Sequence, residues 1–71
     1  MYFTTFYSGT REEFSIIHEN EPRQYGEDRA TYENYLIVTR RPTADEAKAF
    51  FSIAKPQTLC AGISSAKTEK L

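Results

Sequence analysis

Residues 34–56 read NYLIVTRRPTADEAKAFFSIAKP, and they decide the fold class because they combine a strand, a basic turn and a capped helix. The run YLIVT at 35–39 is dense in β-branched and aromatic residues, which suit a pleated, half-buried surface. Leu36 and Val38 alternate with Ile37, so both faces of the strand are apolar. We therefore expect 35–39 to be a central strand, ended by Pro42, which cannot donate to a ladder.

The helix of this stretch is expected to span about 43–55. Thr43 is followed three residues later by Glu46, the spacing of a capping box, in which each side chain bonds the backbone amide of the other residue. Pro56 stops the helix. Four residues at helical spacing form its apolar stripe: Ala47, Phe50, Phe51 and Ala54.

Length and composition predict one small domain. The chain has 71 residues, with five Phe and five Tyr but no Trp, and a formal net charge of −1. This charge gives no global attraction to nucleic acid or to an anionic membrane. A single cysteine fits a reducing compartment, and no signal peptide or membrane-spanning run is visible. We expect a complete cytoplasmic protein that starts at Met1.

The chain before residue 34 is expected to hold a hairpin and a loop. Residues 2–8 read as a strand, Gly9 lies in a turn, and residues 11–18 pair back as a second strand. An alternative for 11–18 is a helix, because TREE at 10–13 is also a capping-box pattern. Residues 19–29 have a proline, a glycine and few apolar side chains, and are expected to form a long exposed loop.

The expected fold class is α+β. Residues 58–63 read as a last strand, which would follow a right-handed crossover if it lay parallel to the strand before the helix. The order is then β-β-β-α-β, a small three- to four-stranded, mostly antiparallel sheet with the helix packed on one face. The domain covers 1–64, and residues 65–71 form a polar, frayed tail.

One helix covers one face of such a sheet and leaves the other open. The open face would carry Tyr35, Ile37 and some of the N-terminal aromatic side chains. An apolar face on a small protein indicates a partner, which is either another protein or a second copy of the chain.

Signals for catalysis are weak. His18 is the only histidine, and we expect it to be a partly exposed residue at a strand end. Cys60 lies in an apolar strand without a nucleophile motif around it. The acidic residues do not match a calcium loop, and the three glycines are too far apart to form a phosphate loop. We expect no enzymatic activity, no metal and no cofactor.

Arginine and tyrosine residues carry the binding hypothesis. Arg40 and Arg41 precede the helix N-terminus, where an anion or an acidic partner could bind, with a solvated turn as the bland alternative. A second group, Arg23, Tyr25, Arg29, Tyr32 and Tyr35, interleaves basic and aromatic side chains. This pattern suits protein hot spots and single-stranded nucleic acid alike. Interspersed acids would repel phosphates, so a protein partner is favoured.

We therefore expect a small non-enzymatic protein that acts by contact with a larger protein or complex. An inhibitor or modulator of a host complex, of the kind that phages and mobile elements encode, fits this description. The alternatives are a nucleic-acid-binding module that uses the same surface and a structural subunit stabilised by homodimerisation. The expected partner-binding residues are Arg23, Tyr25, Glu27, Asp28, Arg29, Tyr32, Arg40 and Arg41.

Overall fold

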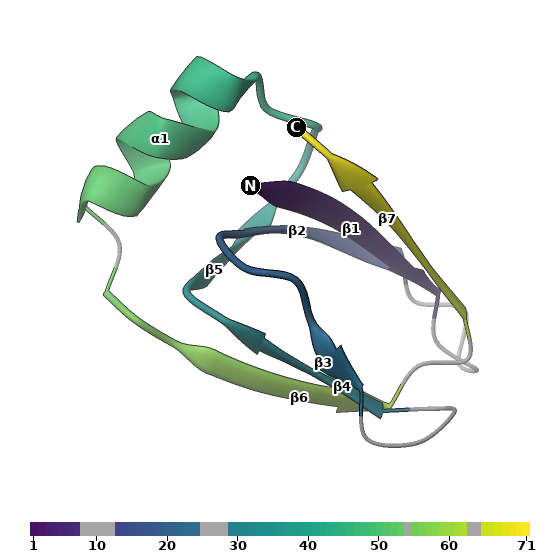
Figure 1. The fold of residues 1–71 in the computed structure, drawn as a ribbon. Coiled ribbons are helices and arrows are strands. Elements are labelled where there is room, and N and C mark those ends of the chain that lie inside the picture. Colours follow the sequence, from purple (N-terminus) through teal and green to yellow (C-terminus); the bar gives the residue numbers. More distant parts are fainter. Residues whose placement is uncertain (8–12, 25–28, 54, 63–64) are drawn as a thin grey trace.

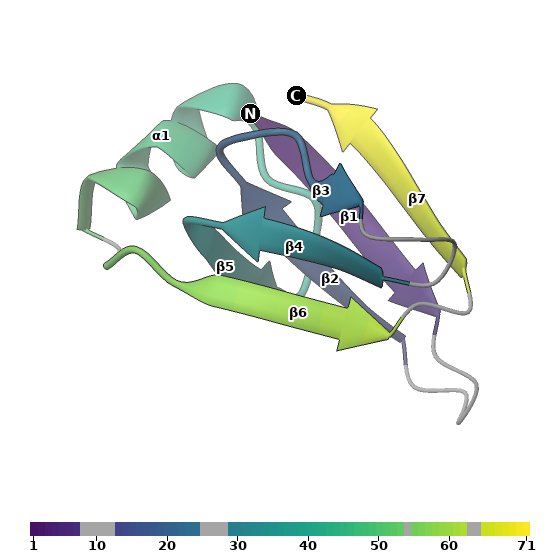
Figure 2. The ribbon, with the colours of Figure 1, turned by 60° about the horizontal axis from the view of Figure 1, so that its bottom comes forward.

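The protein is a small α+β fold in three layers, as Figures 1 and 2 show. The computed structural model describes residues 1–7, 13–24, 29–53, 55–62 and 65–71. A four-stranded sheet lies between a helix on one face and a three-stranded sheet on the other. In chain order the elements are β1 (Tyr2–Tyr7), β2 (Glu13–His18), β3 (Arg23–Gln24), β4 (Arg29–Glu33), β5 (Tyr35–Val38), α1 (Ala44–Ile53), β6 (Thr58–Gly62) and β7 (Ser65–Lys70).

The four-stranded sheet has the order β5-β2-β1-β7 and is antiparallel throughout. β1 and β2 pair along their whole length, from Tyr2 opposite His18 to Tyr7 opposite Glu13. The predicted N-terminal hairpin is therefore confirmed, and the helical alternative is wrong for residues 13–18.

The C-terminal residues form β7 and not a frayed tail. β7 pairs with β1 from Ser65 opposite Tyr7 to Lys70 opposite Tyr2. The amide of Leu71 also donates to the carbonyl of Met1 at 3.0 Å, so the two termini lie side by side (Figure 1). The expectation of a free tail at 65–71 is wrong because this polar segment is an edge strand, whose side chains are mostly exposed while its backbone is paired.

The second sheet has the order β3-β4-β6 and is also antiparallel. β6 pairs with β4, from Thr58 opposite Glu33 to Gly62 opposite Arg29. The expected strand over 58–63 is confirmed in β6, but a parallel crossover next to β5 is wrong. The interval 19–29, expected to be loop throughout, includes β3 and the first residue of β4.

Asn34 separates the two sheets. Its φ of 53° lies in the left-handed region, which asparagine tolerates better than most residues. The bend is held by its amide, which donates to the carbonyl of Gln57 at 2.9 Å, and by its side chain, which donates to the Glu19 carboxylate at 3.0 Å. The chain thus leaves the second sheet at β4 and enters the first at β5. β5 lies at the edge of its sheet, so the expectation of a central strand is wrong.

A hydrophobic core fills the space between the two sheets. Phe6 and Ile16 of the first sheet pack against Ala30 and Tyr32 of the second, and all four are at most 2% exposed. The ring of Phe6 meets that of Tyr32 edge to face, with centroids 5.1 Å apart. The sheet face that was expected to be open is therefore largely covered by the chain's own second sheet, which the strand pattern did not reveal.

A second core lies between the first sheet and α1. Phe3 and Ile17 pack against Ala47, and Phe51 joins them from the next turn of the helix. The predicted helix is confirmed within 44–53, and so is its cap, since Glu46 N donates to Thr43 Oγ1 and Thr43 N donates to Glu46 Oε1, both at 3.2 Å. Among the described residues, no helix is long and apolar enough to cross a membrane.

Candidate protein-binding site

The candidate site is a groove of about 360 Å³ that runs along the outer edge of β5 beside α1. Its lining is Leu36, Ile37, Val38, Thr39, Arg40, Pro42, Glu46 and Phe50. In the part of the chain that the structure describes, β5 has a paired neighbour only in β2. In an antiparallel ladder, backbone groups that do not face one neighbour face the opposite side. The groove therefore combines apolar side chains with backbone groups that can pair with another strand.

The helix wall of the groove is set by the packing of α1. Ala47 is fully buried and Phe51 packs in the core with it, which fixes the rotation of the helix. Phe50 then faces the groove, 38% exposed, instead of joining the buried stripe that the sequence pattern predicted. Ala54, the last residue of that stripe, lies outside the described residues. Ile53 is one turn beyond Phe50 and is 83% exposed.

The rim of the groove carries an ion pair that also caps the helix. Arg40 Nη2 lies 2.5 Å from Glu46 Oε2, and Arg40 Nη1 lies 3.3 Å from Oε1. The hydrogen bonds from Arg40, and then the amide of Thr43, hold the pKa of Glu46 below its ordinary value of 4.5. The same bonds to Glu46 raise the pKa of Arg40. The arginine side chain stays 68% exposed, so the pair fixes its position without removing it from solvent.

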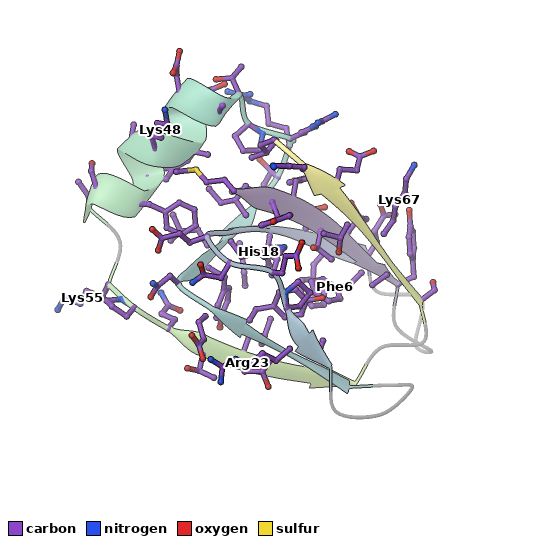
Figure 3. All side chains as sticks on the ribbon, viewed as in Figure 1. Phe6, His18, Arg23, Lys48, Lys55 and Lys67 are labelled. Atoms are coloured by element: carbon purple, nitrogen blue, oxygen red, sulfur yellow. The ribbon has the colours of Figure 1, made fainter. Side chains whose placement is uncertain are left out.

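The structure brings together only part of the predicted partner-binding set. Arg40 and Arg41 adjoin α1, and Arg41 Nη1 lies 3.3 Å from Glu69 Oε2 of β7. Arg23 lies on β3, across the four-stranded sheet from the helix (Figure 3). Arg29 is in β4, with its backbone opposite Gly62. Three members of the set, Tyr25, Glu27 and Asp28, lie outside the described residues.

Tyr32 is not a surface residue. It is 2% exposed in the core between the sheets, where burial raises the pKa of its hydroxyl. Our expectation that it would be presented to a partner is wrong. Its ring fills the space over Phe6 because β4 folds across the first sheet, a long-range arrangement that alternation within one strand does not show.

Sequence reasoning left the apolar side chains of the site out of the predicted partner-binding set, although it placed Ile37 on an open sheet face. Three of the four exposed large hydrophobic side chains in the described residues are Ile37 at 69%, Phe50 at 38% and Ile53 at 83%. All three belong to β5 or α1. Apolar residues on both faces of β5 are typical of a central strand, but in this fold they belong to an edge strand, where Ile37 stays exposed.

A buried polar cluster around His18 is the second notable feature. His18 is fully buried, so the expectation of a partly exposed side chain is wrong. Thr4 Oγ1 lies 2.6 Å from His18 Nε2, and His18 Nδ1 lies 2.8 Å from the carbonyl of Asn20. A hydroxyl beside an imidazole can be a nucleophile and its base. Here Thr4 is also fully buried, which keeps a substrate from reaching the hydroxyl. Figure 3 shows His18 and Phe6 in the interior.

Neither a metal-binding cluster in the described residues nor a similarity to known proteins indicates a function. The described segments hold no group of three or more His, Cys, Asp or Glu side chains that could bind a metal ion. Cys60 lies in β6 with its backbone opposite Thr31. Comparison with protein-family models, with curated proteins and with solved structures finds no match to this chain. The groove along β5 therefore carries the functional inference.

Proposed function

We propose that this protein is a non-enzymatic binding protein that acts by contact with a larger protein at the edge of β5. One observation carries the proposal: an apolar edge strand borders a groove of about 360 Å³ in the described structure. Natural proteins usually protect the edges of their sheets with charges, bulges or covering segments. An apolar edge with a groove beside it is the arrangement expected of a surface that receives another chain.

The partner would supply an extended, apolar segment that pairs with β5. In this mode of recognition, main-chain hydrogen bonds give affinity and pockets for alternate side chains give specificity. The wall between Val38 and Phe50 would receive one such side chain, and Ile37 would contact the segment from the strand. An inhibitor or modulator of a host complex, such as phages and mobile elements encode, would act by occupying that segment of its target.

A nucleic-acid partner has less support from the geometry. Base stacking needs exposed aromatic rings beside cations. Tyr32 lies in the core, and Tyr35 is half-buried against it. Arg40 and Arg41 each face a carboxylate, which lowers their net attraction for phosphate.

The test is affinity capture with two matched variants, in lysate of the source cells or of their host, treated with nuclease. Ile37→Lys places a charge at the groove on a side chain that is 69% exposed, so the fold should tolerate it. Ala66→Lys places the same charge on an exposed position of β7, the opposite edge of the same sheet. We expect a stoichiometric protein with the wild type and with Ala66→Lys, and its loss with Ile37→Lys.

Two results would overturn the proposal. A partner that Ile37→Lys captures as well as the wild type would show that the β5 edge is not the contact. Recovery that depends on nucleic acid and disappears after nuclease treatment would favour the alternative function.

A protein partner that is captured through β5 should slow hydrogen exchange at the amides of β5, because strand addition places new acceptors on them.

A further inference from the structure

The two edges of the four-stranded sheet differ in their protection. β7 carries exposed Lys67 and Lys70, and Lys67 Nζ lies 3.7 Å from Glu69 Oε1. Figure 3 shows Lys67 on this outer strand. Charged side chains of this kind prevent one edge from pairing with another chain. β5, with the sequence YLIV, has no charged residue within the strand. Of the two edges that this sheet has in the described residues, the β5 edge is therefore the one suited to pairing with another chain.

We propose that the β5 edge pairs antiparallel with the β5 edge of a second copy of this chain. Leu36 and Val38 share one face of β5 and Ile37 lies on the other, so a two-fold axis that passes between the two Ile37 residues would place Ile37 of one copy opposite Ile37 of the other, and Leu36 opposite Val38. Every cross-strand pair within the strand is then apolar, which stabilises an antiparallel seam. The two four-stranded sheets become one continuous sheet.

Charge complementarity fixes the direction of the two strands. Exposed Glu33 and Glu19 lie at the start of β5 and Arg40 lies just after its end, whereas Arg41 pairs with Glu69 of β7 at the opposite edge of the sheet. Antiparallel pairing brings the acidic end of each copy to the basic end of the other, whereas parallel pairing brings like charges together. Arg40 keeps 68% of its side chain exposed beside Glu46, so it remains accessible to a second carboxylate. Exposed ion pairs add little affinity, but they select the orientation.

The position of α1 extends the interface beyond the strand. The two-fold axis of an antiparallel pair is perpendicular to the sheet, so the helices of both copies lie on the same face. Phe50 of α1 lines the groove beside β5, whereas the N-terminal end of the helix lies near β7, beside the C-terminus (Figure 1). Phe50 and Ile53, which are 38% and 83% exposed, would approach the same side chains of the second copy. The dimer thus covers three of the four exposed large hydrophobic side chains of the described residues.

Self-association would regulate the binding surface, because the second copy occupies the edge proposed for the partner. This competition rests on the proposed function, whereas the dimer itself does not. A small chain gains stability from such an interface, since it buries a limited share of its own surface. The dimer would be the form present without the partner, and only the monomer, in which the β5 edge is free, would bind the partner.

Sedimentation equilibrium over a dilution series tests the dimer with the purified full chain. We expect the wild type and Ala66→Lys to dissociate reversibly from a mass of two chains to a mass of one. Ile37→Lys places two like charges at the seam and should raise the dimer dissociation constant by about 100-fold or more. A urea unfolding curve of the Ile37→Lys monomer checks that its fold is intact.

Hydrogen exchange distinguishes this seam from a dimer held by the helix alone. The amides of β5 should exchange more slowly at high protein concentration than at low concentration, while those of β7 should not change. A wild type that stays monomeric at every concentration, or a dimer without slowed β5 amides, would overturn the inference. If the wild type is monomeric and the Ile37→Lys substitution still abolishes capture of the partner, the proposed function is supported and only the dimer is excluded. If the dimer is confirmed and no partner is captured, only the proposed function fails.

Discussion

The side chains of Thr4 and His18 are hydrogen-bonded across the β1–β2 hairpin, with 2.6 Å between Thr4 Oγ1 and His18 Nε2. Both side chains are fully buried. The carbonyl of Asn20 accepts from Nδ1 at 2.8 Å, so Nδ1 carries the proton of the neutral ring. Nε2 is then the acceptor and the Thr4 hydroxyl is the donor. Thr68 Oγ1, at 2.9 Å, supplies the hydrogen bond that Thr4 Oγ1 accepts. This chain of hydrogen bonds ties β7 to the first hairpin.

Acid should destabilise the fold through His18. Burial lowers the pKa of His18 from its ordinary value of 6.5, and the positive N-terminus lowers it further, against an opposing hydrogen bond to Asn20. The unfolded chain therefore binds a proton at a higher pH than the folded one. The contribution of the neutral ring is complete above pH 6.5 and is lost as the pH falls from there through the folded pKa, with a slope of at most about 1.4 kcal/mol per pH unit. Urea unfolding at a series of pH values measures it.

The control for this prediction is His18→Gln, which keeps a polar side chain but removes the titrating ring. The groups that face His18 are the ring of Tyr2 at 5.6 Å, the ring of Tyr32 at 4.9 Å, Thr4 and the N-terminus of Met1. Burial raises the pKa of both tyrosines, so neither ionises in acid. A slope just below pH 6.5 that is the same in wild type and His18→Gln would contradict a role for the ring.

Removal of the Thr4 hydroxyl should cost about 1–3 kcal/mol of unfolding free energy, because it leaves a buried Nε2 without its donor. Thr4→Val keeps the shape of the side chain, so packing is largely unchanged. The matched control is Thr5→Val on the opposite face of β1, where the hydroxyl lies 3.3 Å from Ser15 Oγ in a partly buried site. Urea unfolding of both variants should give a clearly larger loss for Thr4→Val. Equal losses would mean that the buried hydrogen bond to His18 contributes no more to the free energy of unfolding than the partly buried one to Ser15.

Local chemistry explains which elements the sequence predicted well. The capping box of Thr43 and Glu46 and the stop at Pro56 act within one helix, and the structure has that helix over 44–53. The N-terminal hairpin and the strand at 58–62 depend on short apolar runs with turn signals nearby. Each of these features is decided by residues that are close in sequence.

Long-range pairing explains what the sequence did not show. β7 is polar and mostly exposed, and its place beside β1 depends on residues 58–68 positions earlier in the chain, from Tyr7–Ser65 to Tyr2–Lys70. Tyr32 was misplaced because the second sheet that buries it forms only when β4 folds over the first. Of the residues that line the groove, Arg40 belongs to the predicted partner-binding set because a basic turn is visible in sequence, and Ile37 was expected on an open face. The edge position of β5 and the exposure of Phe50 depend on long-range packing that the sequence pattern does not show.

A chain that ends at residue 64 should lose its cooperative urea transition. It lacks the β1–β7 ladder and the hydrogen bond from Thr68 to Thr4. It also lacks the packing of Leu71 against the core between the first sheet and α1. Small domains have a marginal free energy of unfolding, so the interactions that remain in the truncated chain are not sufficient to stabilise the fold.

The matched control for the truncation is Lys70→Ala, which changes an exposed side chain and leaves the β7 backbone in place. It should stay within about 0.5 kcal/mol of the wild type. A truncated chain with the wild-type unfolding midpoint would mean that residues 65–71 are dispensable, as their polar composition alone had predicted.

The bend at Asn34 should tolerate glycine and reject valine. At a φ of 53°, a β-branched residue costs about 1–2 kcal/mol, whereas glycine has no such penalty. Asn34→Val should therefore lower the free energy of unfolding by that amount, and Asn34→Gly should change it little. Both variants also lose the side-chain bond to Glu19, 3.0 Å in the wild type, so Glu19→Ala measures that contribution separately. If the loss in Asn34→Val only equals that in Glu19→Ala, the backbone conformation at residue 34 is not what keeps β4 and β5 in different sheets.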